Sequence, residues 1–205
     1  MILYVHGKGG SADEAEHYRA LFPGEDVVGL DYTAQTPWAA KEEFPRLYDS
    51  ACKDRSPITL IANSIGAYFA MTARSEQRIA RAFFISPIVD MEKLITDRMT
   101  WANVSEPELR ARGEIETAFG ETLSWAYLSY VRAHPLRWTV PTHILYGEND
   151  PLTAQETVSR FAAQIHATLT VMAGGEHWFH TEEQMQFLDD WIRKQDRRGT
   201  LGFVK

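Results

Sequence analysis

One serine stands where a strand is predicted to turn sharply into a helix. A short apolar run, Ile58–Asn63, leads into Ser64, and small residues lie two before and two after it, at Ala62 and Gly66. A helix and a strand approach each other closely at such a turn, so its flanks must be small, and the turn presents the hydroxyl for attack. The pattern predicts that Ser64 is a nucleophile. The alternative is that Ser64 only caps the helix that follows.

A serine hydroxyl needs a base to remove its proton, and the base needs an acid to orient it. Asp150 follows the strand-like run Thr142–Tyr146 and a glycine turn, and it precedes a proline. His177 follows the run Thr168–Met172 and a pair of glycines. Taken singly, the first is a turn or cap aspartate and the second a loop histidine. Together with Ser64 they predict a Ser64–His177–Asp150 triad at the carboxyl ends of three strands.

Other residues compete for these roles. Asp90 also follows a strand-like run and is the alternative acid, but the glycine–turn–proline context favours Asp150. His180 lies three residues after His177 and is interpreted as structural. Glu176 either tunes His177 or is a solvated loop residue. No His/Cys/Asp cluster has metal-ligand spacing, so we expect neither a metal nor a cofactor.

The elements that must position these residues alternate along the chain. Apolar runs of strand length are nearly continuous, as in strands covered on both faces of a parallel sheet. They are Ile2–His6, Asp26–Leu30, Ile58–Asn63, Ala80–Ser86, Thr142–Tyr146 and Thr168–Met172. Helical patterns lie between them, at Ala12–Leu21, Trp38–Lys53, Ser64–Arg74, Ala154–Gln164 and Glu182–Arg197. The alternation predicts an α/β fold with a mainly parallel sheet of about six strands flanked by helices.

Residues 87–139 break this rhythm. No clear strand is predicted there, and helical patterns cover Pro107–Glu116 and Thr122–Arg132. We expect a helical cap inserted into one domain, residues 1–205, and lying over the carboxyl ends of the strands, where open α/β sheets bind ligands.

The aromatic residues of the cap are expected mostly to fill a small core. We expect Trp125 and Tyr127 of the cap, together with Trp178 beside His177, to line a substrate pocket.

Four segments together resemble the α/β-hydrolase superfamily, which uses the chain order Ser, Asp, His. They are Tyr4–Gly10, Ala62–Gly66, Gly147–Leu152 and Gly174–His177, and the resemblance runs from Ile2 to about Lys194. There are two departures. Ala62 replaces the first glycine of the serine motif, and the first strand here is the one that superfamily members place third, so the first two strands of the fold are missing.

The resemblance implies a serine hydrolase, most simply a carboxylesterase that cleaves a small acyl ester through an acyl-enzyme. It also implies that the backbone amides of Lys8 and Ile65 form the oxyanion hole, with His6 holding the loop that carries Lys8. An amidase, a thioesterase or a C–C hydrolase would use the same triad, and a hydrolase-fold binding protein with an idle triad is the non-catalytic alternative.

Composition indicates which kinds of partner and which cellular compartment to expect. The 205 residues are 44% hydrophobic and 24% charged, with a net charge of −7, which disfavours nucleic acid and anionic membranes and leaves a small-molecule substrate. Cys52 is the only cysteine and is expected to be a buried structural thiol. Without a signal segment or an internal disulfide, a cytoplasmic location is expected. The sequence does not indicate an oligomeric state.

Overall fold

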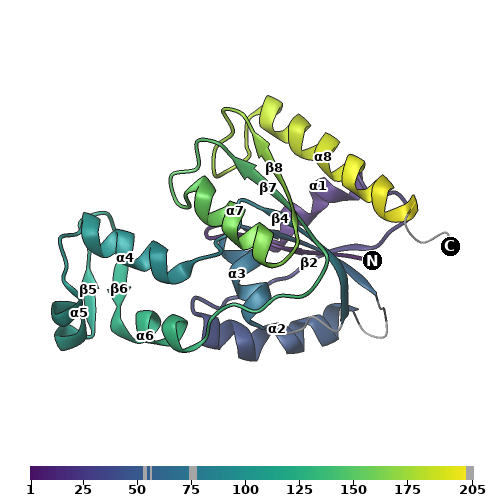
Figure 1. Cartoon of the computed structure of the whole chain (residues 1–205). Coiled ribbons are helices and arrows are strands. Elements are labelled where there is room, and N and C mark those ends of the chain that lie inside the picture. Colours follow the sequence, from purple (N-terminus) through teal and green to yellow (C-terminus); the bar gives the residue numbers. More distant parts are fainter. Residues whose placement is uncertain (53–54, 56, 74–77, 202–205) are drawn as a thin grey trace. The chain divides into compact units, whose positions relative to one another are not determined.

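The computed structural model describes residues 1–52, 55, 57–73 and 78–201, and Figure 1 shows its elements. The chain forms two compact units. Met1–Val89 and Trp138–Lys205 make one, here called the sheet unit, and Asp90–Arg137 make the other, here called the inserted unit. Each unit is described by itself.

The sheet unit contains one parallel sheet of six strands. They are β1 (Ile2–Val5), β2 (Val27–Gly29), β3 (Ile58–Asn63), β4 (Ile79–Ile85), β7 (Thr142–Gly147) and β8 (Thr168–Met172). Their spatial order is β2-β1-β3-β4-β7-β8, and every neighbouring pair is parallel. This confirms the predicted parallel sheet, and all six predicted strands are present. Because β3, β4 and β7 run side by side in one direction, the residues that follow them emerge at one edge of the sheet.

Helices cover the sheet on both faces (Figure 1). In the sheet unit they are α1 (Glu16–Arg19), α2 (Pro37–Cys52), α3 (Ile65–Thr72), α7 (Gln155–Gln164) and α8 (Glu182–Leu201). The predicted helix Ala12–Leu21 is shorter than expected, since its first turn is the 3₁₀ segment η1 (Ala12–Ala15). The predicted last residues of two other helices, Lys53 and Arg74, lie outside the described residues.

Alternate residues of a strand point to opposite faces, and both faces of the central strands β1, β3, β4 and β7 are mostly buried, whereas the edge strands β2 and β8 are mostly half-buried. On one face, the Tyr4 ring lies 5.1 Å from the Tyr18 ring of α1, and the Phe83 ring lies 5.7 Å from Trp191 of α8. Two-sided burial explains why the central strands read as nearly continuous apolar runs in the sequence.

A second aromatic cluster joins α2, α3 and the segment after β2. The Phe44 ring of α2 lies 5.0 Å from Tyr32, 5.9 Å from Tyr48 and 6.4 Å from Phe69 of α3. All four rings are buried. This cluster fixes α3, and with it the residue that begins the helix.

The inserted unit contains helices and a hairpin. Its elements are α4 (Met91–Trp101), α5 (Glu106–Arg112), β5 (Glu114–Glu116), β6 (Thr122–Ser124) and α6 (Trp125–Ala133). The two predicted helices, Pro107–Glu116 and Thr122–Arg132, are present as α5 and α6, but the expectation of no strand was wrong: Gly113, with a φ of 78°, ends α5 early, and β5 and β6 replace the end of the first predicted helix and the start of the second. The two short strands pair antiparallel with only their central residues, Ile115 and Leu123, buried, and this period-2 pattern was hidden inside a helical one.

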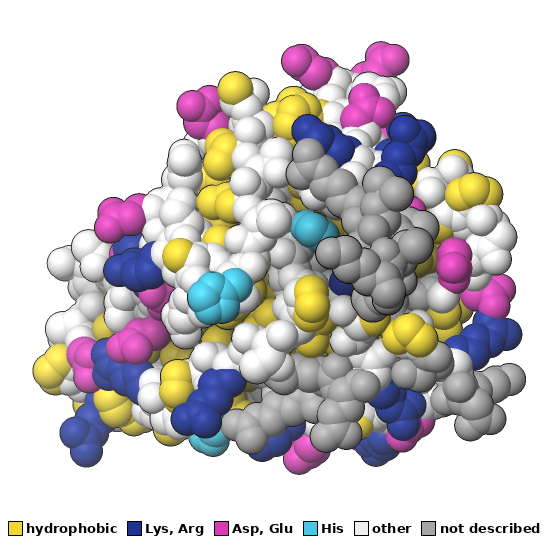
Figure 2. Space-filling view, turned by 45° about the vertical axis from the view of Figure 1, so that its right-hand side comes forward, with side chains coloured by type: hydrophobic (Ala, Val, Ile, Leu, Met, Phe, Trp, Pro, Cys, Tyr) yellow, Lys and Arg dark blue, Asp and Glu magenta, His cyan; other side chains and the backbone are white. Residues whose placement is uncertain are grey.

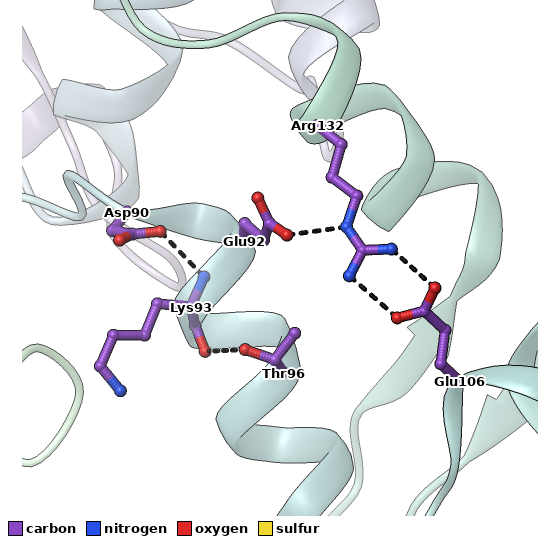
Figure 3. Close-up of polar contacts among 6 residues, drawn as sticks. All are labelled: Asp90, Glu92, Lys93, Thr96, Glu106 and Arg132. Carbon is purple, nitrogen blue, oxygen red and sulfur yellow. Dashed lines mark hydrogen bonds and ion pairs between the residues drawn. The ribbon is translucent and has the colours of Figure 1, made fainter.

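One arginine joins three helices of the inserted unit, as Figure 3 shows. Arg132 of α6 donates to Glu92 of α4 at 2.7 Å and, with two nitrogens, to Glu106 of α5 at 2.8 and 2.9 Å. The hydrogen bonds from Arg132 lower the pKa of the Glu106 carboxyl below its usual value. The inserted unit thus has a polar cross-link of its own.

The surface is mixed in character. On the face seen in Figure 2, acidic and basic side chains are interspersed, and hydrophobic side chains lie among them. The large hydrophobic side chains that are exposed among the described residues are Trp38, Trp101, Phe119 and Trp178. Within the described ranges, no helix combines the length and apolar character that crossing a membrane requires.

Candidate active site

Ser64 occupies a strained turn between β3 and α3. Its φ of 52° and ψ of −124° are unusual for a residue other than glycine. Backbone hydrogen bonds hold the turn: Ser64 N donates to Ile85 O at 3.0 Å, and Ser64 O accepts from Ala67 N and Ile88 N at 3.2 Å. The conformation is therefore imposed by the neighbouring strand β4 and by the segment that follows it.

The residue two positions after Ser64 must be glycine for a packing reason. A Cβ on Gly66 would lie 3.0 Å from Val5 and still closer to the carbonyl oxygen of His6. Glycine therefore lets α3 begin directly against the end of β1. Ala62 on the other flank is fully buried in β3, and its methyl group is accommodated.

The structure brings Ser64, His177 and Asp150 together in one hydrogen-bonded chain. Ser64 Oγ lies 2.8 Å from His177 Nε2, and His177 Nδ1 lies 2.7 Å from Asp150 Oδ2. A carboxylate only accepts, so we assign the ring proton to Nδ1, which leaves Nε2 to accept the proton of Ser64. The His177 side chain is 16% exposed, whereas that of Asp150 is wholly buried. The arrangement can remove a proton from the serine hydroxyl.

Backbone amides compensate for the lost hydration of the buried Asp150 carboxylate. Asp150 Oδ1 accepts from Leu152 N at 2.7 Å and from Thr153 N at 3.2 Å. The Tyr146 hydroxyl donates to Thr153 O at 2.6 Å, which ties this turn to β7. Burial, and to a smaller extent the charge of Asp150, raise the pKa of Tyr146, so the phenol stays a donor.

The loops that carry the acid and the base lie against each other. Glu148 N donates to Met172 O at 3.0 Å, and Asn149 N donates to Gly175 O at 2.8 Å. A Cβ on Gly147 would collide with the backbone of Gly175 and Glu176. This close contact sets the spacing between Asp150 and His177 through the main chain.

The loop after β1 passes directly beside Ser64. A Cβ on Gly7 would lie 3.1 Å from Ser64 Cβ and 3.8 Å from Ser64 Oγ. The amide of Lys8 is the next one along this loop, and that of Ile65 opens α3, where the first amides have no intrahelical acceptor. The two amides predicted to form an oxyanion hole thus belong to segments that flank the serine.

The rings of His6 and Tyr32 hold the loop after β1 in place. The His6 ring stacks on Tyr32 at 4.2 Å and its Nδ1 lies 2.8 Å from Gly7 O. The Tyr32 hydroxyl donates to His6 O at 2.9 Å. This is the holding role that the sequence indicated for His6, whereas Tyr32 carried no recognisable signal because it lies in an irregular segment.

The three residues predicted to line a substrate pocket belong to different units. Trp178 is 67% exposed and stacks on His180 at 4.4 Å, and the His180 ring nitrogen Nδ1 lies 2.8 Å from Trp178 O. Trp125 and Tyr127 begin α6 of the inserted unit, so their place in a substrate pocket stays a prediction.

Neither the alternative acid, Asp90, nor the cysteine belongs to this hydrogen-bonded chain. Asp90 caps α4 by accepting from Lys93 N at 2.9 Å (Figure 3). Cys52 is fully buried, and burial raises the pKa of its thiol, which disfavours the reactive thiolate. In the part of the chain that the structure describes, no group of three or more His, Cys, Asp or Glu side chains is placed to hold a metal ion.

Solved structures of other proteins share this fold. The mouse alpha/beta hydrolase domain-containing protein 10 superposes with a TM-score of 0.74 at 15% identity, over 96% of this chain and 89% of its own. Est1E from Butyrivibrio proteoclasticus superposes with a TM-score of 0.74 at 16% identity, over 96% of this chain and 86% of its own. An esterase of Pyrococcus furiosus superposes with a TM-score of 0.60 at 19% identity, over 96% of this chain and 80% of its own. No protein-family model and no curated protein matches the sequence. The chain has the α/β-hydrolase fold.

Proposed function

We propose that this protein is a serine hydrolase, and that it cleaves a small carboxylic ester through a covalent acyl-enzyme. The observation that carries the proposal is the continuous chain of hydrogen bonds from Ser64 through His177 to the buried Asp150. The strained turn at Ser64 supports it, because such strain is concentrated at functional sites. Esterases among the proteins of the same fold support the choice of an ester substrate.

The chemistry follows from the geometry. Ser64 Oγ attacks the ester carbonyl while His177 Nε2 takes its proton, and Asp150 stabilises the imidazolium that forms. The Lys8 and Ile65 amides donate to the oxyanion of the tetrahedral intermediate. His177 then gives the proton to the departing alcohol. Water, deprotonated by His177, releases the acid and restores Ser64.

A fluorophosphonate probe tests the nucleophile directly. We expect wild type to be labelled at one site and Ser64→Ala to be unlabelled but folded. Ser50→Ala is the matched control, since Ser50 is exposed on α2, and it should label like wild type. Labelling that persists in Ser64→Ala, or a folded wild type that does not label, would contradict the proposal.

A second assay tests the ester. Wild type should hydrolyse nitrophenyl esters, with a preference among acyl lengths, faster than the corresponding anilides and thioesters. Ser64→Ala should lose this activity by about 10⁴-fold or more, as removal of a triad nucleophile does. If the probe labels wild type but no ester is hydrolysed, the assignment of Ser64 as an activated nucleophile stands and the esterase assignment is rejected.

A further inference from the structure

A second serine lies at the same edge of the sheet and is not used in the proposed mechanism. Ser86 directly follows β4, the strand between β3, which leads to Ser64, and β7, which leads to Asp150. Ser86 N donates to Leu145 O of β7 at 2.8 Å. The residue before it, Ile85, accepts from Ser64 N at 3.0 Å. Ser86 therefore sits between the strand end that carries the nucleophile and the one that carries the acid.

Two features of Ser86 are unfavourable for stability. Its side chain is completely buried, and its hydroxyl makes no hydrogen bond to any residue that the structure describes. Its φ of 43° lies in the left-handed region, which non-glycine residues seldom occupy. A buried donor without a partner weakens a fold, and strain of this kind is concentrated at functional sites.

The acid has acceptor capacity that matches this donor. Asp150 Oδ1 accepts two amides and Oδ2 accepts His177 Nδ1, which uses three of the roughly four lone-pair positions of a carboxylate. The Asp150 side chain is wholly buried, so bulk water does not reach it. Asp150 N donates to Gly147 O at 3.0 Å, and this turn keeps the carboxylate at the end of β7, beside the strand that ends before Ser86.

We propose that Ser86 is a positioning residue for the acid–base pair: its hydroxyl donates to one buried water, which in turn donates to the remaining lone pair of Asp150. Such a bond holds the carboxylate in line with the His177 ring while that ring carries the proton of Ser64. It is a bond to a charged group, which is stronger than one between neutral groups. The inference rests on the proposed acid–base role of Asp150 and His177.

Kinetics of Ser86→Ala and Ser86→Gly separate positioning from folding. We expect kcat per fluorophosphonate-titrated site to fall roughly tenfold, the effect of losing one hydrogen bond to a charged group, with KM unchanged. The melting temperature should fall in Ser86→Ala, which loses the bond, and should fall less in Ser86→Gly, because glycine also relieves the left-handed backbone. Ser50→Ala should change neither value. An unchanged kcat per titrated site in both Ser86 variants would overturn the inference.

A readout without turnover tests the same inference independently. The proton between His177 Nδ1 and Asp150 should give a far-downfield proton NMR signal, identified by its loss in His177→Ala. Ser86→Ala should move this signal, whereas Ser50→Ala should not, and an unmoved signal in Ser86→Ala would reject the positioning role. If the signal moves but wild type hydrolyses no ester, the ester assignment fails while the role of Ser86 stands.

Discussion

The residues of the site differ in how strongly the surrounding structure constrains them. Ser64 sits in a left-handed turn that costs about 1–3 kcal/mol, and three backbone hydrogen bonds hold it there. Asp150 is buried and accepts two amides and the His177 ring, so its orientation is fixed before any substrate arrives. A side chain that is already oriented loses little entropy when the reaction begins.

Asp150→Asn tests this orientation. The asparagine can still accept from Leu152 N and Thr153 N, but it turns an amide NH₂ toward His177 Nδ1. The ring must then carry its proton on Nε2, which can no longer accept the proton of Ser64. We expect kcat to fall by about 10⁴-fold, as in the well-studied triad with the same change.

The kinetic measurement needs a charge control. Glu156→Gln removes a carboxylate from an exposed position in the first turn of α7 and should leave kcat unchanged. Ester hydrolysis by Asp150→Asn within tenfold of wild type would assign the acid role elsewhere.

At this scale much of the site could be predicted from the sequence. Ser64, Asp150 and His177 each stand in a local context of small residues and turns that has its own signature, and the structure brings the three side chains together. Tyr146, Tyr32 and Ser86 could not be found in this way. Tyr32 acts through His6, 26 residues away, Ser86 has a left-handed backbone, and Tyr146 donates to a carbonyl seven residues on, and none of these leaves a local pattern.

Elements position the site through their ends. The loop after β1 depends on Tyr32, which stacks under His6 and donates to its carbonyl oxygen. Tyr32 is itself held by Phe44 of α2 and Phe69 of α3. Packing in the aromatic cluster is therefore linked to the loop that carries the Lys8 amide.

Tyr32→Phe should destabilise the protein by about 1 kcal/mol and lower kcat, because the His6 carbonyl loses its donor. Tyr48→Phe is the matched control in the same cluster. The Tyr48 hydroxyl is buried and, among the described residues, has no hydrogen-bond partner, so its removal should leave stability equal or higher and kcat unchanged. Thermal unfolding and ester kinetics measure both effects, and equal behaviour of the two variants would contradict the anchoring role.

Long, buried elements could be predicted from the sequence, and short, exposed ones could not. The four central strands of the parallel sheet were predicted because burial on both faces makes each a nearly continuous apolar run, whereas the half-buried edge strand β8 alternates threonine with apolar residues. The hairpin of β5 and β6 was missed because three residues with one buried position cannot be told from a helical turn. The left-handed Gly113 and Gly120 lie on either side of β5, and a glycine by itself does not say which element follows.

For the molecule as a whole, the inserted unit has its own cohesion. Arg132 links α4 and α5 to α6, and the resulting hydrogen bonds lower the pKa of Glu106. A carboxyl whose pKa is lower in the folded state stabilises that state above its unfolded pKa. This contribution is therefore present at neutral pH and is lost as the pH falls through the folded-state pKa, below the usual value of about 4.

Arg132→Met should make the inserted unit more susceptible to proteolysis at neutral pH, and the difference from wild type should vanish in acid. Limited proteolysis followed by mass spectrometry locates the cuts, and chemical denaturation over the same pH range measures the loss of stability. Lys93→Met is the control, because Lys93 pairs with Asp97 within α4 and joins no separate elements. A pH-independent effect of Arg132→Met would show that its packing, and not its charge, matters.

The position of the inserted unit in the chain also sets an order of assembly. Strands β1, β3 and β4 are complete within the first 85 residues, whereas β7 follows only after Asp90–Arg137. Closing that long connection costs entropy. During synthesis from the N-terminus, the turn at Ser64 is therefore made before the acid and the base exist. In the proposed mechanism, the serine of the nascent chain is therefore inert until β7 and β8 dock and bring Asp150 and His177 to it.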